Sequence, residues 1–389
     1  MSTHFETQAI RNQTERSQFS EHSTPLYLTS SFVFDDAEDM RASFAEEKEK
    51  NLYSRFSNPN TTEFVDKMVA MEGAEAGYAF ATGMAAIFST FGALLNAGDH
   101  IVSCRSVFGS THTLFTKYLP KWNIETSYFN VGESDTIESL IQPNTKILYA
   151  ETPTNPAVDI LDLALLGAIA KKHNLLLVID NCFATPYLQN PIKFGADIVI
   201  HSATKLIDGQ GRVLGGVAVG NVDLIREIYL FSRNTGPAMS AFNAWVLSKS
   251  LETLSIRVER HCENALKVAT FLEGNSNVNF VKYPFLKSHP QYEIAKKQMR
   301  LGGNIVAFEV KGGVEAGRNF LNNIKMCSLS ANLGDTRSIV THPASTTHNK
   351  LNEPDCLEVG ISDGLVRVSV GLEHVSDIIN DLKQALESI

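Results

Sequence analysis

One lysine in this sequence stands where a buried strand is expected to end. The stretch DIVIHSATKLIDGQGRVLGG, residues 197–216, passes from apolar residues to hydroxyl side chains, then to Lys205 and a glycine-rich turn. A lysine amine shielded from water can condense with an aldehyde, and pyridoxal phosphate enzymes hold their cofactor through such a bond. Taken alone, Ser-x-Thr-Lys is more often a surface turn, so the interpretation depends on the residues around it.

Such a cofactor needs further groups, and the sequence offers candidates for them. Ser202 and Thr204 flank the lysine with hydroxyls that can donate to a phosphate. The amides of Gly83 and Met84, in ATGMAAIF, open a predicted helix, where free N–H groups and the helix dipole favour an anion. Asp180 ends the apolar run LLLVID twenty-five residues before the lysine, and a buried carboxylate there can keep a ring nitrogen protonated.

Short apolar, β-branched runs alternate with helical patterns through the first two thirds of the chain. The runs are HIVSCR (100–105), KILYAE (146–151), LLLVID (175–180), DIVIHS (197–202) and GVAVG (216–220). This alternation predicts an α/β fold with a mainly parallel sheet in three layers. Sites in such sheets lie beyond the carboxyl ends of the strands, where Glu151, Asp180 and Ser202 are expected.

The two ends of the chain differ from this middle part. Residues 244–274 form one helical stretch, longer than usual if unbroken, and are predicted to connect domains. NIVAFEV and LVRVSVGLE then predict strands of a smaller α+β domain, and the first fifty-two residues have no obvious core. We therefore expect an arm on a neighbouring subunit (1–52), a cofactor-binding α/β domain (53–243) and a C-terminal α+β domain (244–389).

Composition narrows the class of partner. The 389-residue chain carries a net charge of -9 without a cluster of Lys and Arg, so we expect small-molecule substrates and no nucleic acid. Its five cysteines are scattered and form no C-x-x-C pair, which indicates neither a disulfide framework nor a zinc site. The polar N-terminus lacks the apolar centre of a signal peptide, so a cytoplasmic location is expected.

One uncharged window, AGYAFATGMAAIFSTFGALLNAG (76–98), is long enough to span a bilayer if it were one helix. Glycines, a threonine and a serine interrupt it, and GYAFATG is typical of a strand that meets a turn. We therefore expect no membrane span here.

Together these motifs resemble the pyridoxal phosphate enzymes of cysteine and methionine metabolism, which have the type I (aspartate aminotransferase-like) fold. The matching motifs run in order from Tyr53 to Glu373, and they are YSRFSNPN, ATGMAAI, ETPTNP, VIDNCFATP, HSATK, THPASTTH and RVSVGLE. Several ordered motifs carry more weight than any one of them. The resemblance implies pyridoxal 5'-phosphate as the cofactor and no metal.

The resemblance also implies roles for single residues. Lys205 would form the Schiff base and Asp180 would pair with the pyridinium nitrogen, and the phosphate ligands would be Gly83, Met84, Ser202 and Thr204. Asn155 in TPTNP would lie near the phenolic oxygen of the cofactor and the substrate carboxylate. Arg367 would clamp that α-carboxylate, because a planar guanidinium donates to both of its oxygens.

The resemblance implies an oligomer as well. Tyr53 and Arg55 in YSRF would reach the phosphate bound by the neighbouring subunit, so the active unit would be at least a dimer. Members of the family are usually homotetramers, which can be described as dimers of active dimers.

Three departures from the family pattern narrow the expected activity. Phe108 stands where many members stack a tyrosine, so its ring can stack but proton transfer falls on Lys205, helped by Tyr53. Ser110 replaces the reactive cysteine of the methionine γ-lyases, which disfavours a dedicated lyase. Asn332 in SANLGDTRS, and DGQGR after the lysine, resemble the O-succinylhomoserine sulfhydrylase branch, with Asn332 expected at the substrate.

That branch replaces the succinate of O-succinyl-L-homoserine by sulfide and gives L-homocysteine for methionine biosynthesis. Cystathionine γ-synthase, O-acetylhomoserine sulfhydrylase and methionine or cystathionine γ-lyase stay open as alternatives, and so does a cofactor carrier without turnover. A succinyl carboxylate needs a cation besides Arg367. Arg212 in GQGR is the expected cation, with Arg105 and Arg337 as the alternatives.

Overall fold

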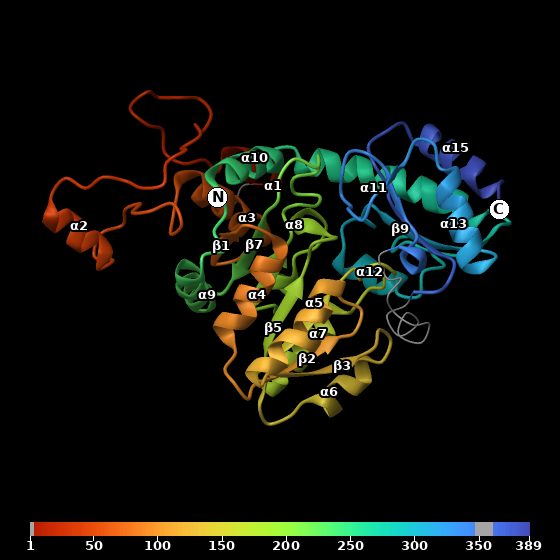
Figure 1. Ribbon diagram of the computed structural model, residues 1–389, viewed down its shortest axis with the longest axis horizontal. Coiled ribbons are helices and arrows are strands. Elements are labelled where there is room, and N and C mark those ends of the chain that lie inside the picture. Colours follow the sequence, from red (N-terminus) through yellow and green to blue (C-terminus); the bar gives the residue numbers. More distant parts are fainter. Residues whose placement is uncertain (1–3, 347–360) are drawn as a thin grey trace.

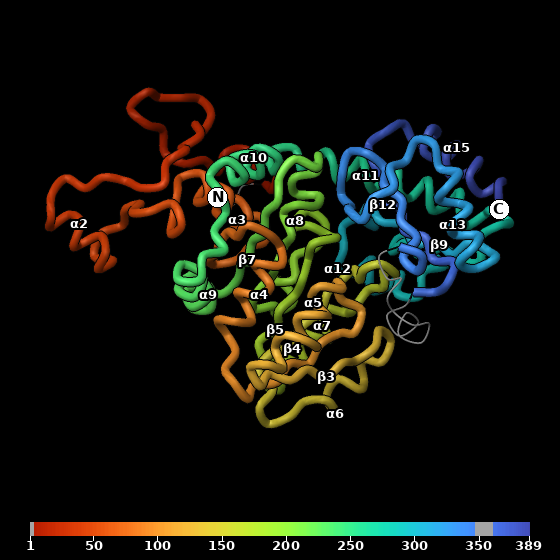
Figure 2. Tube along the Cα trace, viewed as in Figure 1, coloured from red at the N-terminus to blue at the C-terminus, as the bar shows by residue number. Residues whose placement is uncertain are grey.

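The computed structural model describes residues 4–346 and 361–389 (Figure 1). Cys356 and the last two residues of THPASTTH lie outside these ranges. The described chain forms a seven-stranded sheet and a five-stranded sheet, and the figure shows them side by side, the smaller one towards the C-terminus. An N-terminal segment reaches out from this body (Figure 2).

The larger sheet has the strand order β1-β7-β6-β5-β4-β2-β3. Strands β2 to β6 run parallel to one another, whereas β7 is antiparallel to both β6 and β1. The strands are β1 (Ala76–Phe80), β2 (His100–Cys104), β3 (Glu125–Phe129), β4 (Thr145–Glu151), β5 (Leu176–Asp180), β6 (Ile198–His201) and β7 (Gly216–Gly220). The predicted α/β class with a mainly parallel sheet is confirmed, and β3 is a strand that the apolar runs did not predict.

Helices cover this sheet and begin where the sequence supplies caps. Asn58 forms a capping box with Thr61, and Thr82 and Asp162 accept from backbone amides of the first turns that follow them. The helices are α3 (Pro59–Glu72), α4 (Gly83–Leu94), α5 (Gly109–Thr113), α6 (Ile137–Leu140), α7 (Leu163–His173), α8 (Thr185–Leu188) and α9 (Val222–Thr235). Within this set α3 and α9 pack on β1, α4 on β7 and α7 on β5.

The uncharged window of residues 76–98 divides into β1, a turn and α4, as predicted. Across residues 4–346 and 361–389, no helix combines the length and the apolar character that a membrane span requires.

The stretch from residue 244 onwards is two helices and not one. Helix α10 (Ala241–Leu251) ends before Glu252, and α11 (Leu254–Glu273) begins after Thr253. Figure 1 shows α11 running from α10 across to the smaller sheet.

The smaller sheet has the order β10-β11-β12-β9-β8 and is mostly antiparallel. Its elements are β8 (Val278–Lys282), β9 (Ile305–Val310), β10 (Ser328–Leu329), β11 (Ile339–Thr341) and β12 (Leu365–Ser369), with α12 (Tyr292–Gln298), α13 (Gly313–Asn323) and α15 (Val375–Leu386). Val366 and Val368 pack in an apolar core with α11, α13 and α15. Successive strand residues face opposite sides, so Arg367 between them points away from that core.

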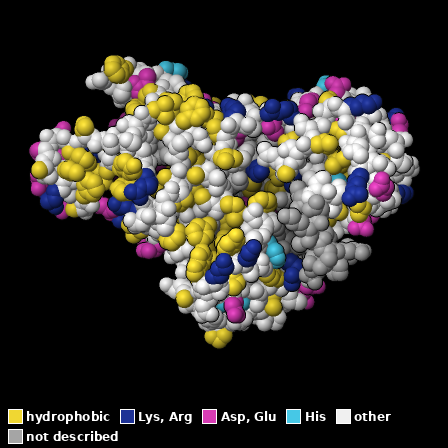
Figure 3. All heavy atoms as spheres, in the orientation of Figure 1, with side chains coloured by type: hydrophobic (Ala, Val, Ile, Leu, Met, Phe, Trp, Pro, Cys, Tyr) yellow, Lys and Arg dark blue, Asp and Glu magenta, His cyan; other side chains and the backbone are white. Residues whose placement is uncertain are grey.

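The N-terminal segment carries helices α1 (Phe5–Arg11) and α2 (Ala37–Phe44). Glu63 on α3 accepts from the amide of Thr14, and the indole of Trp245 donates to the carbonyl of Thr24 at 2.9 Å. Between and after these anchors the segment exposes large apolar side chains, namely Phe19, Leu28, Val33, Met40 and Phe44. Figure 3 shows hydrophobic side chains gathered over this part of the molecule. A surface of this kind fits contact with another protein chain.

Candidate active site

Lys205 lies in the turn that follows β6, on the side of the strand's carboxyl end. Its amine donates to the side-chain oxygen Oδ1 of Asn332 at 2.6 Å. Burial lowers the pKa of this amine below the ordinary value for lysine. A larger fraction of the amine is therefore unprotonated near neutral pH, which is the form that attacks an aldehyde or accepts a proton.

Asp180 ends β5, and its carboxylate is buried. Oxygen Oδ1 accepts from the backbone amide of Cys182 at 3.0 Å. Burial raises the pKa of Asp180 to about 6, although the Cys182 amide and the nearby His201 act in the opposite direction. Among the described residues, no Lys, Arg or His forms an ion pair with it. A cationic ring nitrogen would supply the missing positive partner.

A tight junction joins the start of α4 to the turn that holds the lysine. A Cβ at Gly83 would lie 2.6 Å from Cβ and 2.9 Å from Oγ of Ser202. Thr82 caps the helix by accepting from the amide of Ala85 at 3.0 Å. The amides of Gly83 and Met84 belong to the first helical turn and have no carbonyl within the helix to donate to. The structure thus brings three of the four predicted phosphate ligands together.

The hydroxyl of Thr204, the fourth, has backbone partners. It donates to the carbonyl of Gly215 at 3.2 Å and accepts from the amide of the same residue at 3.1 Å. These bonds close the loop between the lysine and β7.

Arg367 lies within β12 and is almost completely buried. Its Nη1 donates to Oδ1 of Asn155 at 2.9 Å, and Nη2 donates to the carbonyls of Ala331 and Asn332. Burial lowers the pKa of the guanidinium to about 10, so the group still carries its charge at neutral pH. In the described part of the chain its buried Nε has no hydrogen-bond partner. A bound carboxylate can supply that acceptor.

Asn332 connects these two groups, because its side chain accepts from Lys205 and its carbonyl accepts from Arg367. Gly334, with a φ of +74°, lies in the same segment and packs closely against the backbone of the turn that holds Lys205. A Cβ at Gly334 would lie 2.6 Å from the amide of Leu206. Sequence reasoning placed Asn332 at the substrate and did not predict its contact with Lys205.

Phe108 stands at the start of α5 with 44% of its surface exposed. Its backbone amide donates to Oε2 of Glu151 at 2.7 Å. The ring is therefore accessible for stacking while its backbone is fixed to the end of β4. Ser110 follows in the first turn of α5.

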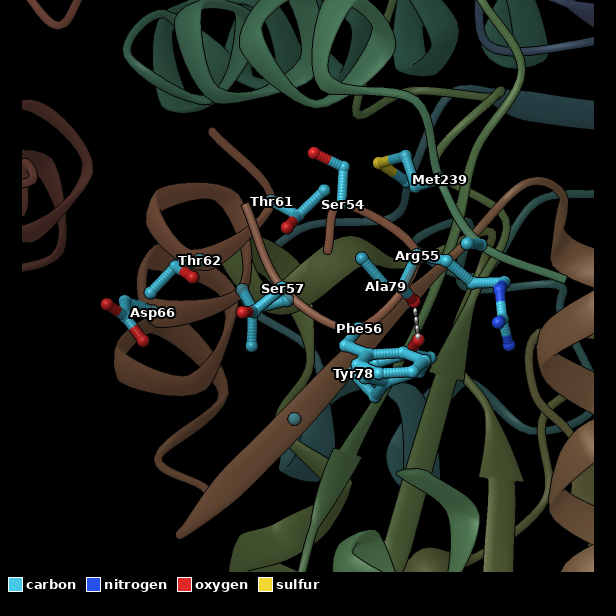
Figure 4. A pocket seen from close by; sticks show the side chains of 13 residues that line it. Ser54, Arg55, Phe56, Ser57, Thr61, Thr62, Asp66, Tyr78, Ala79 and Met239 are labelled. Carbon is cyan, nitrogen blue, oxygen red and sulfur yellow. Dashed lines mark hydrogen bonds between the residues drawn. The ribbon is translucent and has the colours of Figure 1, made fainter. Parts of the chain in front are cut away.

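In the described part of this chain, the guanidinium of Arg55 contacts Tyr53, Phe56 and Arg233, and it makes no hydrogen bond or ion pair with the turn that holds the lysine. The guanidinium of Arg55 donates to the carbonyl of Arg233 and stacks on the ring of Phe56. Arg55 also lines a cavity of about 210 Å³, and its carbonyl accepts from the hydroxyl of Tyr78 (Figure 4). The role of Tyr53 and Arg55 in a neighbouring subunit's site stays a prediction.

The three candidate cations for a succinyl group each have partners. Arg212 donates to Asp208 through Nε at 3.0 Å, and its Nη2 contacts Asp208 and Ser250. Arg337 forms an ion pair with Asp335 at 2.7 Å. Arg105 lies over an aromatic ring, that of Tyr128.

A family model described as "Cys/Met metabolism PLP-dependent enzyme" matches residues 6–387. The chain belongs to this family. An O-succinylhomoserine sulfhydrylase of Pseudomonas aeruginosa is 44% identical over 385 residues, which cover 99% of this chain and 96% of the relative. An L-methionine gamma-lyase of Porphyromonas gingivalis is 44% identical over 392 residues, which cover 100% and 98%.

A solved structure from Campylobacter jejuni, assigned as an O-acetylhomoserine (thiol)-lyase, matches with a TM-score of 0.96 and 33% identity. The match covers 99% of this chain and 100% of that one, and that structure carries a pyridoxyl-lysine monophosphate. Family membership confirms the type I fold, an enzymatic activity and pyridoxal phosphate as the cofactor. Because a sulfhydrylase and a lyase match equally well, particular residues must decide between those reactions.

The residues present fit this cofactor: a buried amine, a buried carboxylate that has no cationic partner in the described part of the chain, and a helix start packed against Ser202. We predict that Lys205→Ala removes the covalent attachment of pyridoxal phosphate, because no other amine stands in this turn. After borohydride reduction, peptide mass spectrometry should find the pyridoxyl mass on the Lys205 peptide of the wild type and on no peptide of the variant.

Lys193→Ala, at an exposed lysine before β6, is the matched control and should keep the label on Lys205. A label retained at full yield on another lysine of Lys205→Ala would contradict the assignment.

Proposed function

We propose that this protein is an O-succinylhomoserine sulfhydrylase, which replaces the succinate of O-succinyl-L-homoserine by sulfide and releases L-homocysteine for methionine biosynthesis. The observation that carries the proposal is the contact of Asn332 with the amine of Lys205. An asparagine at this position is the feature by which the sequence resembles the O-succinylhomoserine sulfhydrylases. The sulfhydrylase of Pseudomonas aeruginosa, alike along nearly the whole chain, supports the same choice.

We assign the cofactor contacts as follows. Lys205 attaches pyridoxal phosphate, Asp180 pairs with its ring nitrogen, and Phe108 stacks on the ring. The phosphate lies against the helix start and the lysine turn, at Gly83, Met84, Ser202 and Thr204. Pyridoxal phosphate, when bound, supplies the electron sink that makes a proton on the α-carbon of the substrate acidic.

The chain's own groups then orient the substrate and move its protons. Arg367 binds the α-carboxylate with the help of Asn155, which already lies within hydrogen-bond distance of the guanidinium. The amine of Lys205, whose pKa burial lowers, takes the proton from Cα and passes it on to the bound cofactor and substrate. It is then free to take one from Cβ, because an amine holds only one extra proton. Succinate leaves from Cγ, sulfide adds to the same carbon, and Lys205 returns the protons as homocysteine is released.

One residue favours replacement over elimination, because Ser110 stands at the position where methionine γ-lyases carry a reactive cysteine. The second candidate is the γ-lyase reaction, which the equally similar relative from Porphyromonas gingivalis favours.

We further propose a homotetramer in the cytoplasm, built from dimers in which Tyr53 and Arg55 complete the phosphate site of the neighbouring subunit. The exposed apolar side chains of the arm, residues 1–52, support a surface that another subunit covers. In this proposal residues 53–243 bind the cofactor, and residues 244–389 supply Asn332 and Arg367.

The direct test is to incubate the purified protein with O-succinyl-L-homoserine alone, with sulfide and with cysteine, and to identify the products by mass spectrometry. We expect homocysteine with sulfide, formed faster than cystathionine with cysteine. Cystathionine as the main product would assign a cystathionine γ-synthase, and 2-oxobutanoate in all three reactions would assign a γ-lyase. Turnover of O-acetylhomoserine but not of the succinyl ester would show that the proposed leaving group is wrong.

We propose that Arg212 binds the succinyl carboxylate, because Asp208 and Ser250 hold its guanidinium through Nε and Nη2, and its side chain is 39% exposed. Arg212→Ala is then expected to lower kcat/KM for the succinyl ester roughly tenfold relative to the acetyl ester. Arg337→Ala is the matched control. An unchanged ratio of the two esters in Arg212→Ala would exclude this role.

A further inference from the structure

Two carboxyl groups end neighbouring strands of the larger sheet. Glu151 ends β4 and Asp180 ends β5, and the two are Cα partners in the parallel ladder. Aligned residues of a parallel pair face the same side of the sheet, so both side chains point to the same region. Both are buried, with 3% of Glu151 and 6% of Asp180 exposed.

In residues 4–346 and 361–389 neither carboxyl forms an ion pair with a cation. Each accepts one backbone amide instead, from Cys182 for Asp180 and from Phe108 for Glu151. The guanidinium of Arg367 on β12 faces this region but donates to other oxygens. The remaining titratable groups around the two carboxyls are Lys205, His201, Tyr149, Cys104 and Cys182.

Two adjacent buried carboxylates cannot both be ionised cheaply, so one of them takes up a proton. Burial, and after it the charge of Asp180, raises the pKa of Glu151 well above its ordinary value. The Phe108 amide and Arg367 only partly oppose this shift. Asp180 must be ionised to pair with a cofactor nitrogen, and Glu151 is then the neutral member of the pair.

We propose that Glu151 is a protonated positioning residue, which fixes the backbone of Phe108 without adding a second negative charge beside Asp180. The carbonyl of Phe108 accepts from the amide of His112 within α5, but the hydrogen bond to Glu151 is the one that ties Phe108 to the end of β4, and 44% of the residue is exposed. The hydrogen bond to Glu151 therefore sets where the ring stands over the site. The inference rests on the cofactor site proposed above but not on the choice of ester or sulfur nucleophile.

The test is Glu151→Gln in the cofactor-loaded protein, because the amide oxygen accepts from Phe108 as the acid does but never ionises. A carboxyl with a raised pKa in the folded state binds its proton more tightly there than in the unfolded chain, whose pKa is near 4.5. Its contribution to stability is therefore complete below that value and is lost as pH rises towards the folded pKa. Glutamine escapes this loss.

We expect the Tm of Glu151→Gln minus that of the wild type to increase by several degrees between about pH 5.5 and 9. Glu315→Gln, at an exposed glutamate of α13, should show a difference that does not change over this range. A flat difference for Glu151→Gln would overturn the proposal, because it would mean that Glu151 is already ionised in the folded protein.

Circular dichroism of the bound cofactor tests the positioning role. Glu151→Gln should keep the wild-type signal, whereas Glu151→Ala, which lacks the acceptor for Phe108, should lose most of it. Equal loss in both variants would show that the negative charge is needed and would overturn the proposal.

Infrared spectroscopy of the wild-type protein tests directly whether Glu151 is protonated, and it does not depend on whether a variant folds. The carbonyl stretch of a neutral carboxylic acid should be present at neutral pH and should shift when glutamate is labelled with carbon-13. A spectrum without such a band would equally overturn the proposal.

Discussion

The site depends on one residue that holds two functional groups from different parts of the chain. Asn332 accepts from the amine of Lys205, 127 positions away, and from the guanidinium of Arg367, 35 positions away. Lys205 follows a strand of the larger sheet, whereas Arg367 lies within a strand of the smaller one. The amine of Lys205 and the guanidinium of Arg367 are therefore aligned only when the two sheets are docked.

Several polar contacts maintain that docking, and they converge on the loop between β4 and α7. Lys282 of β8 forms an ion pair with Asp159 at 2.7 Å, and Gln298 of α12 donates to the carbonyl of Leu161 at 3.0 Å. The same loop carries Asn155, the partner of Arg367. Burial lowers the pKa values of Lys205 and Arg367 and raises that of Asp180, so each group is less readily charged than it would be in water.

Much of this arrangement could be predicted from the sequence, because continuous apolar runs identify buried parallel strands and polar residues at their ends identify the site. Strand β3 was missed because its edge position leaves most of ETSYF only half-buried, and β10 and β11 are too short for a pattern. The contact of Asn332 with the lysine could not be predicted, since it depends on domain docking.

The most direct test of this account is the exchange of substrate protons in Asn332→Ala. L-norvaline has no leaving group on Cγ, so NMR in deuterated water can follow the exchange of its Cα and Cβ protons without turnover. If Asn332 orients the lysine and supports the clamp, exchange at both carbons should slow by roughly tenfold or more, and norvaline should bind more weakly. Unchanged exchange and affinity would contradict the central role of Asn332.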